Sequence, residues 1–406
     1  MKYTFILLGS LCAFTLSSNA QQGRTYAITG KQNNNFLWAD IKQVDITTGK
    51  VTKTLFESEK TTFKTKSLDA TPQAKQQPIN PTAFGVAACA LDVRHNRLYF
   101  APMHYSNIQY LDLDEATPNF VTIKRNVLPL SKNGLVAEES QLTRMVIAAD
   151  GYGYAITNDG NHLIRFSTGK TPEVTDLGNL VDAESNNGIS IHNKCSSWGG
   201  DMLADAFGEL VVITAAHNVF SVNVNSRVAT YKGTITGLPA NYTTNGAVVD
   251  NDGDIIVSSA NVFDGIFKLN YKDLKAVKVA GSENGFNASD LANSNLLLQK
   301  EKAAADKYND TKIISSPFDV AKTRIFPNPV TTNQFNVSFE KQQAGKYTIV
   351  FTDLSGRTLQ SKVVAVSNSS QVESLKVARK LLPGTYMVKV LDQNKRVTFS
   401  DKVVVL

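Results

Sequence analysis

The sequence predicts an all-β protein in two parts, an N-terminal β-propeller followed by a small immunoglobulin-like β-sandwich. Helical patterns are nearly absent, and only Gln299–Asp306 is helix-prone. Strand-like runs instead recur in similar units over most of the chain. After residue 319 the rhythm changes to short, regularly alternating strands. These three observations carry the fold prediction.

Each repeated unit begins with a strand of small residues, turns at an aspartate and returns as a strand rich in β-branched and aromatic residues. The turns fall at Asp92, Asp150, Asp205 and Asp250, which are 58, 55 and 45 residues apart. Outer strands such as "HLIRFST" and "EVTDLG" follow. Four strands per unit at this spacing are typical of a β-propeller. A pair of β-sandwiches is the alternative.

The two ends of the repeat region complement each other. A last unit, "NASDLANSNLLLQK", has its turn expected at Asp290, but no outer strands follow it. The N-terminal runs "FLWADIKQVDI" and "VTKTLF" supply them, so one unit built from both ends closes the ring without an open edge. This predicts five blades, or six if Arg24–Thr29 begins another. Glu59–Phe84 is polar and is expected as a long loop.

The first 20 residues have the pattern of a secretory signal peptide. An apolar run, Phe5–Leu16, precedes the small residues of Ser18-Asn19-Ala20. A lipid-modified Cys12 is the alternative, which Leu11 before it disfavours. No later run is long enough for a transmembrane helix. The expected domains are a signal peptide (1–20), a propeller (21–305), a linker (306–319) and a sorting sandwich (320–406).

Charge and cysteines narrow the classes of partner. The formal net charge is +6. Residues 319–406 hold 13 Lys and Arg against 6 Asp and Glu, a net charge of +7. Without Lys2 the chain carries +5, so residues 21–318 carry a net charge of −2. This balance argues against nucleic-acid binding by the propeller and suits an anionic partner for the tail.

Cys89 and Cys195 each adjoin apolar runs and are expected as free, buried thiols, although export would permit a disulfide.

The tail carries four motifs in order: "FPNP", "DLSGR", "LPGTYMVKV" and a final "KVVVL". Prolines at a strand end keep the first strand from continuing another sheet. With these motifs, Val320–Leu406 resembles the type A C-terminal sorting domain of the Bacteroidetes type IX (Por) secretion system. The residues that carry the resemblance are Pro327, Asn328, Pro329, Asp353, Gly356, Pro383, Gly384, Tyr386 and Lys402.

The resemblance implies a route. The signal peptide would take the chain to the periplasm, and the type IX machinery would recognise the folded tail and carry the protein across the outer membrane. In the family a surface cysteine peptidase commonly removes the tail, and the remainder is attached to anionic lipopolysaccharide or released. The expected location is therefore the cell surface or the medium.

Polar and aromatic residues gather in the loops expected at one end of the propeller. His104, His162 and His217 fall between the second and third strands of successive units, and further candidates lie between units. The predicted ligand-binding residues are His104, Glu139, His162, Glu184, Asn187, His192, Trp198, His217 and Tyr242. No histidine pair has zinc-site spacing, and no catalytic or cofactor motif is present, so no metal or cofactor is expected. Asp250, Asp252 and Asp254 lack the glycine and glutamate of a calcium loop and indicate a hairpin turn.

The sequence supports three functions of different kinds. The first is a secreted or surface propeller that binds a glycan or a protein. The second is an extracellular hydrolase or lyase acting on polysaccharide, with Glu139, Glu184, His162, His192 or His217 as acid or base. The third is a structural surface component. An enzyme should bring a catalytic pair together at the mouth of the channel, whereas a binding module should expose aromatic side chains there without such a pair.

Overall fold

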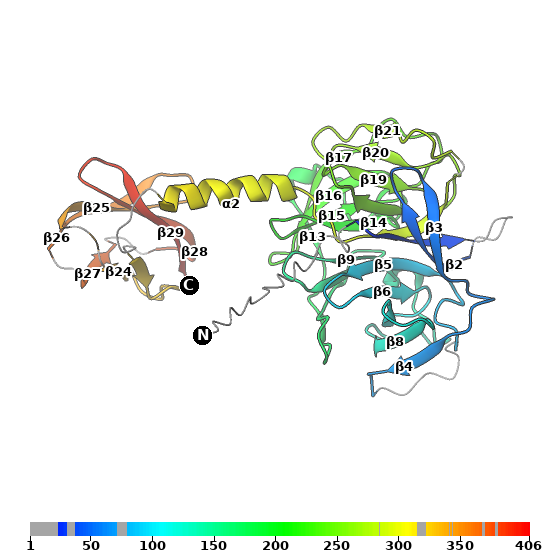
Figure 1. Ribbon diagram of the computed structural model, residues 1–406. Helices are drawn as coiled ribbons and strands as arrows, with labels where there is room; N and C mark the ends of the chain where they lie inside the picture. Colours follow the sequence, from blue (N-terminus) through cyan, green and yellow to red (C-terminus); the bar gives the residue numbers. More distant parts are fainter. Residues whose placement is uncertain are drawn as a thin grey trace, which may run out of the picture. The chain divides into compact units, whose positions relative to one another are not determined.

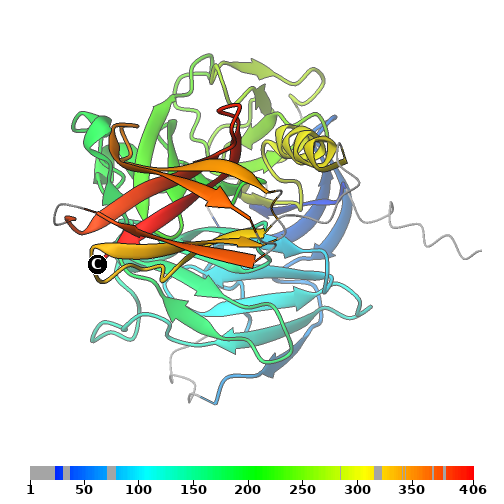
Figure 2. The ribbon, with the colours of Figure 1, turned by 90° about the vertical axis from the view of Figure 1, so that its left-hand side faces the viewer.

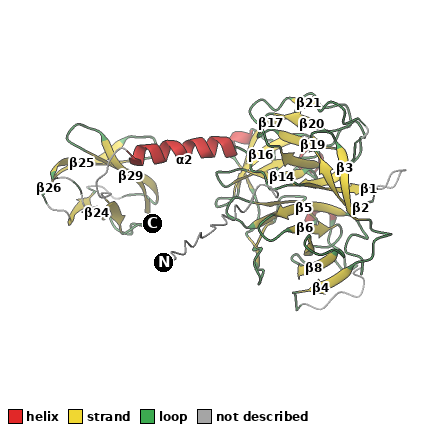
Figure 3. Ribbon diagram, in the orientation of Figure 1, coloured by secondary structure: helices red, strands yellow, loops and turns green. Residues whose placement is uncertain are grey.

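The computed structural model describes residues 23–30, 37–70, 79–283, 285–314, 322–340, 342, 344–367, 370–377 and 381–406. The predicted signal peptide lies outside these residues. Strands far outnumber helices in the described chain, which confirms the all-β prediction (Figure 3). It forms two compact units, Met1–Lys307 and Tyr308–Leu406, called the body and the tail below. Among the described residues, no helix is both long and apolar enough to cross a membrane.

One sheet of the body joins its first strands to its last. The strand order is β22-β1-β2-β3, with β22 at Ala288–Ala292, β1 at Thr25–Gly30, β2 at Trp38–Asp45 and β3 at Lys50–Phe56. β1 and β22 are antiparallel, and Tyr26 lies opposite Ala292. β1 is therefore the second strand of this sheet, not the inner strand of a sixth unit as one reading of the sequence had it.

The body contains four further sheets in its described part (Figure 1). The second has the order β4 (Lys64–Ser67), β8 (Asn119–Lys124), β7 (Ile108–Asp112), β6 (Arg97–Pro102), β5 (Val86–Asp92). The third has the order β12 (Val174–Asp176), β11 (Leu163–Phe166), β10 (Gly153–Thr157), β9 (Leu142–Ile147). The fourth has the order β13 (Val181–Asp182), β17 (Val228–Thr234), β16 (Asn218–Asn223), β15 (Glu209–Ile213), β14 (Asp201–Ala204). The fifth has the order β18 (Gly246–Val249), β19 (Ile255–Ser258), β20 (Phe267–Leu269), β21 (Ala276–Lys278).

The five sheets follow one another around a closed ring. Their first strands contact each other in the cyclic order β22, β5, β9, β14, β18 and back to β22. An apolar cluster fills each of the five spaces between neighbouring sheets. Because every sheet buries both faces against its neighbours, the inner strands are apolar nearly throughout, without the alternation of a half-exposed strand.

The first turn of each unit is held by an acceptor side chain. Asp92, Asp150, Asp205 and Asp250 each accept a hydrogen bond from the backbone N–H two residues further on, at 2.8–3.0 Å. In the first sheet this position belongs to Asn293, which accepts from the N–H of Asn295 at 3.2 Å. Asp290, expected at that turn, lies inside β22 with its side chain buried. The pair Ser289-Asp290 resembles the residues that end the inner strands of the other units. The turn expected from the sequence therefore falls before the observed turn at Asn293.

Two segments expected to be irregular are regular. The expected loop Glu59–Phe84 contains β4, which pairs in parallel with β8; Thr71–Pro78 lies outside the described residues. Helix α2 spans Gln299–Ile314 and so includes the start of the expected linker. Alanine and lysine favour the helix, and Lys302 pairs with Asp306 one turn later at 2.6 Å. Shorter helical pieces are η2 (Glu138–Ser140), η3 (Glu184–Asn186) and α1 (Lys194–Ser197).

The tail consists of two sheets around one core (Figure 2). One sheet has the order β23 (Lys322–Phe326), β24 (Gln334–Glu340), β27 (Ser370–Lys376). The other has the order β26 (Thr358–Val366), β25 (Gly345–Thr352), β28 (Gly384–Leu391), β29 (Val397–Val405). Phe335 of the first sheet contacts Phe351 of the second, with ring centroids 5.3 Å apart. The inward residues of both sheets form a single apolar cluster.

Candidate functional site

Most of the predicted ligand-binding residues lie at one end of the ring. Neighbouring strands are antiparallel, so the loops between second and third strands share an end with the connections between sheets. We call this end the loop face. The aspartate turns lie at the opposite end, called the turn face.

His104 lies on the loop face between β6 and β7 and forms part of a small aromatic group. The Phe84 ring meets the His104 ring edge-on, with centroids 6.2 Å apart, and leaves 44% of Phe84 exposed. The Nδ1 atom of His104 lies 3.2 Å from the amide nitrogen of Gln141, at the start of β9. This group joins the second sheet to the third.

His192 and Trp198 belong to the connection that carries α1. The Nδ1 atom of His192 donates to the carbonyl of Asp159 at 2.7 Å, and the Trp198 indole N–H donates to the carbonyl of His192 at 3.3 Å. The ammonium of Lys194 lies 4.5 Å from the centre of the Trp198 ring and 2.9 Å from the Glu138 carboxylate. These contacts present an aromatic ring and opposite charges at the surface together.

Three predicted residues are exposed but stand apart. Glu139 lies in η2, where its carbonyl accepts from the Asp159 N–H at 3.1 Å. Glu184 is the first residue of η3, and Asn187 follows this helix in a left-handed conformation with φ 52°. An asparagine tolerates that conformation better than most residues, which accounts for its place there.

His162 and His217 each have a separate partner. His162 Nδ1 lies 2.7 Å from the Asp176 carboxylate on β12, the outermost strand of its sheet. His217 Nε2 bonds the backbone carbonyl of Tyr242. Tyr242 itself is 1% exposed, and its hydroxyl donates toward the carbonyls of Val257 and Gly265. This corrects the expectation for Tyr242, whose ring is part of the core between the fourth and fifth sheets.

The structure thus brings His192 to Trp198 and His217 to Tyr242, and leaves the other predicted residues spread over the face. His162, His192 and His217 point to different partners, so they form no common site. Within the described residues, no group of three or more histidine, cysteine, aspartate or glutamate side chains is arranged to hold a metal ion.

Sequence reasoning missed a buried arginine beneath the loop face. Arg144 of β9 is 0% exposed, and its guanidinium donates to the carbonyls of Gly199, Ser197 and Thr157. Burial lowers the pKa of Arg144 to about 10. Because these bonds fix the backbone on both sides of Trp198, Arg144 positions the loop that carries it. A charged residue inside the apolar strand "LTRMVI" was the available signal.

Two buried carboxyl groups lie at the centre of the ring, and sequence reasoning missed these as well. Asp201 of β14 accepts from the N–H groups of Met202 and Ala247, both at 2.6 Å. Asp290 of β22 accepts from the N–H of Cys89 at 3.0 Å and lies 2.9 Å from the Cys89 sulfur. The two carboxyl groups contact each other, and Asp290 Oδ2 has no other partner among the described residues.

Burial controls the protonation of this pair. It raises the pKa of Asp201 to about 8 and that of Asp290 well above its usual range, with the Asp201 charge adding to the effect on Asp290. The Cys89 thiol is also buried, and its pKa is raised for the same reason. Burial therefore favours the protonated form of both carboxyl groups, and the nearby Arg144 guanidinium interacts with Asp201. Cys195, expected to be buried, is exposed in α1, a four-residue helix in the connection between two sheets.

The axis of the ring is closed by side chains. The cavity there is lined by small and apolar residues of the inner strands, including Cys89, Met145, Ala247 and Leu291. Its volume is about 10 Å³, enough for the centre of one water molecule. Within the described residues, the axis of the ring therefore has no room for a substrate.

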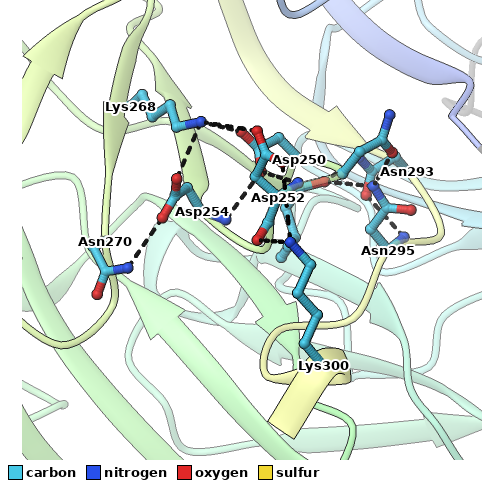
Figure 4. A network of polar contacts seen from close by, with 10 residues as sticks. Asp250, Asp252, Asp254, Lys268, Asn270, Asn293, Asn295 and Lys300 are labelled. Carbon is cyan, nitrogen blue, oxygen red and sulfur yellow. Dashed lines mark hydrogen bonds and ion pairs between the residues drawn. The ribbon is translucent and has the colours of Figure 1, made fainter. Parts of the chain in front are cut away.

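On the turn face, the acidic turn at Asp250 is occupied by lysine (Figure 4). The Lys268 ammonium lies 2.8 Å from Asp250, 3.1 Å from Asp254 and 3.6 Å from Asp252. Lys300 of α2 donates to the Asp252 carbonyl at 2.7 Å. The contact with Asp250 raises the pKa of Lys268. The turn is a hairpin as predicted, and its charges are paired, not merely solvated.

In the tail, the opening motif is bonded to the last strand. The Asn328 side chain donates to the Lys402 carbonyl at 2.8 Å and accepts from the Val404 N–H at 2.9 Å. Val330 then exchanges backbone bonds with Val404 and Leu406, at 2.7 and 3.0 Å. Asn328 therefore stands in for a strand backbone between Pro327 and Pro329, which lack N–H donors.

The other predicted sorting residues shape turns or cover the core. The Asp353 carboxylate accepts from the Arg357 N–H at 3.0 Å, and Gly356 has the positive φ, 84°, that this turn requires. Tyr386 stacks on Phe351, with centroids 5.1 Å apart, and its hydroxyl donates to the Leu382 carbonyl at 2.9 Å. Pro383, Gly384 and Lys402 are exposed.

Comparisons with known proteins identify the tail. Residues 324–406 match the family described as the secretion system C-terminal sorting domain. The tail therefore carries a type IX sorting domain, which indicates export across the outer membrane to the cell surface or the medium.

No curated protein matches the chain. Among solved structures it is similar to PorZ, a surface component of the type IX secretion system of Porphyromonas gingivalis (15% identity, 94% of this chain and 51% of that one, TM-score 0.33). It is also similar to the extracellular domain of a putative one-component system of B. thetaiotaomicron (11%, 90% and 46%, 0.33) and to virginiamycin B lyase of Staphylococcus aureus (9%, 79% and 84%, 0.32). The chain spans about half the length of the first two.

Proposed function

We propose that the chain is an exported five-bladed β-propeller that binds an extracellular partner through its loop face. Five sheets with contacting inner strands and five apolar clusters between them support this fold for the body. Two sheets around one core, with seven strands in the described residues, support an immunoglobulin-like sandwich for the tail.

The sorting domain determines the route and carries the proposal. Its presence implies that the type IX machinery handles this chain. A signal peptide at residues 1–20 would supply the earlier step into the periplasm. Removal of the tail by a surface peptidase, and attachment of the body to anionic lipopolysaccharide, are further proposals. The tail charge of +7 suits anionic partners.

The loop face has the chemistry of a binding surface. Phe84 and Trp198 present aromatic rings beside His104, Gln141 and the Lys194–Glu138 pair. Aromatic rings offer apolar contact area at low cost in conformational entropy, and the polar groups around them orient a partner. A glycan or an extended protein segment would use such a surface.

The alternative of a polysaccharide hydrolase or lyase gains no support from the site residues. His192 and His217 each use a ring nitrogen to bind a backbone carbonyl. The His162–Asp176 pair lies at an outer strand, away from the axis of the ring. An acid–base mechanism needs its groups within reach of one bond of the substrate.

Truncation tests the route. A chain ending at Asp319 should accumulate in the periplasm, whereas the full chain should reach the surface or the medium, as measured by immunoblotting of cell fractions. Fusing residues 320–406 to a periplasmic reporter should export the reporter. Export of the truncated chain at the level of the full chain would refute the assignment.

Paired substitutions test the binding surface. Trp198→Ala and Tyr152→Ala each remove an aromatic ring that contacts a cation, Lys194 on the loop face and Arg165 on the turn face. On arrays of surface polysaccharides and extracellular proteins, Trp198→Ala should weaken binding by about tenfold or more, as loss of a central aromatic contact does. Tyr152→Ala should leave binding unchanged. Equal effects of the two substitutions would contradict a loop-face site.

A further inference from the structure

The ring closes between its fifth and first sheets, where strands β18 and β19 contact strand β22. We call the space between these two sheets the seam. The first sheet pairs β1 with β22, so strands from the two ends of the body meet beside the seam. Each of the other four sheets is built from one continuous stretch of chain.

The seam has no buried aromatic ring among the described residues. Its buried apolar side chains are those of alanine, valine, isoleucine and leucine, and the aromatic residue packed against them, Phe286, is only partly buried. Each of the other four clusters contains at least two buried aromatic rings, for example Tyr154 and Phe220 between the third and fourth sheets. Because aromatic side chains bury the largest apolar areas, parting two sheets costs least at the seam.

Two buried hydroxyl groups of the seam, Thr29 Oγ1 and Ser258 Oγ, have no hydrogen-bond partner in the described part of the chain. Side chains alternate along a strand, so Thr29 faces the same side of β1 as Ala27, which belongs to the apolar cluster of the seam. The Ser258 hydroxyl and the side chain of Leu291, another member of this cluster, both lie next to Gly246. A buried hydroxyl without a partner is costly, and water that reaches it removes this cost, so both groups favour opening.

Amide side chains hold the seam closed at its two ends. On the turn face, Asn293 and Asn295 donate to the Val249 carbonyl of the fifth sheet at 2.8 and 2.9 Å. On the loop face, the Asn287 amide donates to the Ala260 carbonyl at 3.0 Å. Each such bond adds little net stability, because water can replace it. The seam is therefore closed by exchangeable polar bonds at its ends and by small apolar side chains between them.

We propose that the body opens at the seam, by parting of the first and fifth sheets, while the other four spaces stay closed. The parting breaks the amide bonds of Asn287, Asn293 and Asn295 and lets water reach the hydroxyls of Thr29 and Ser258. The strands keep their backbone pairing within each sheet, so the opening is a local motion of two packed faces. It belongs to the body alone and does not depend on the loop-face site.

Thiol labelling of the full chain with a water-soluble maleimide tests the proposal. In a Cys195→Ser background, Ala27→Cys places a thiol in the seam, and Ala155→Cys places one between the second and third sheets. Both alanines are 0% exposed and lie on the second strands of their sheets. The native Cys89, also 0% exposed, belongs to the space between the first and second sheets and serves as an internal reference.

Ala27→Cys should be labelled at least about tenfold faster than Ala155→Cys and Cys89, a ratio that one aromatic pair in the core would account for. Ala288→Cys, on β22 in the same cluster, is a second seam reporter in case Ala27→Cys does not fold, and it should also react fast. Peptide mass spectrometry measures each site separately. Equal rates at all sites, as global unfolding would give, or faster labelling outside the seam would overturn the proposal.

Two substitutions should change the opening in opposite directions. Asn295→Ala removes an amide bond at the turn face and should speed labelling of Ala27→Cys about threefold, with Ala155→Cys unchanged. Ser258→Ala removes a hydroxyl without a partner and should slow labelling of Ala27→Cys. Unchanged labelling of the seam in both variants would refute the assigned roles and the proposal with them.

Ser106→Ala is the matched control for Ser258→Ala. The Ser106 hydroxyl is also buried, but it donates to the Leu128 carbonyl at 3.0 Å and lies away from the seam. Its loss should therefore not slow labelling in the seam. Slowing of the same size in Ser106→Ala and Ser258→Ala would contradict the role given to the Ser258 hydroxyl and overturn the proposal.

Discussion

Replacing Asp290 with asparagine should flatten the pH dependence of the body's stability between pH 5 and pH 8. In the native chain the contacting carboxyl groups of Asp290 and Asp201 are buried, and burial raises both pKa values. Asparagine has nearly the same shape and is neutral at every pH. Its carbonyl can accept from the Cys89 N–H, and its amide can donate to Asp201, so the change removes the titrating carboxyl of Asp290 and keeps its hydrogen bonds.

The sign and size follow from proton linkage. Burial raises the pKa of Asp290 well above 3.8, so over this interval the folded state holds a proton on Asp290 that the unfolded state has lost. Stability is then fully present below the unfolded pKa and falls as pH rises toward the folded one, by about 1.4 kcal/mol per pH unit. From pH 5 to pH 8 the native chain should lose up to ~4 kcal/mol of unfolding free energy through Asp290. The Asp290→Asn variant keeps Asp201 and should lose up to this amount less.

Urea unfolding at pH 5, 6, 7 and 8 measures this difference. Both tryptophans, Trp38 and Trp198, belong to the body, so their fluorescence reports its unfolding without a contribution from the tail. Asp252→Asn, on the exposed turn, is the control and should keep the native slope. Parallel pH profiles for the native chain and Asp290→Asn would refute the raised pKa of Asp290.

Three further predictions concern other contacts. Arg144→Met should destabilise the body by about 3 kcal/mol or more, because it leaves buried carbonyls without donors; urea unfolding measures this, and a loss below about 1 kcal/mol would contradict the role given to Arg144. Asn328→Ala should reduce the exchange protection of the Val404 amide and the exported fraction together, and unchanged protection would argue against the bond between the opening motif and β29. Lys268→Met should destabilise the body at pH 7, because it leaves the carboxylates of the Asp250 turn without their ammonium partner; urea unfolding measures this, and an unchanged midpoint would contradict the ion pairs.

Much of the fold could be predicted because it follows from local patterns in the sequence. Aspartate turns and β-branched strands recur at similar spacing, and the tail begins where prolines interrupt the rhythm. The partners of β4 and β1 could not be predicted in this way. β4 is a short polar strand whose pairing with β8 depends on a segment more than 50 residues away. The length of α2 was underestimated because Asn309 and Asp310 favour turns when only local propensity is weighed.

The candidate site was less predictable for a related reason. Loop position identifies which end of the ring a histidine occupies but not where its ring points, so His162, His192 and His217 could be grouped by sequence and still have separate partners. Tyr242 shows the same limit, since a tyrosine in a polar loop can turn inward to fill the core. The buried residues Arg144, Asp201 and Asp290 were visible as charges in apolar strands, but their common partners come from different sheets.

The pairing of β1 with β22 also sets the order in which the body can be completed. Tyr26 and Ala292 are neighbours in the sheet although they are separated by nearly the whole body in sequence. Until β22 has been synthesised, β1 has one unpaired edge and the last gap in the ring stays open. The sorting domain follows β22 in the chain, so the segment that recruits the outer-membrane machinery emerges only after the body has received its last strand. A chain presented for export by its tail is therefore one in which the closing strand is already available.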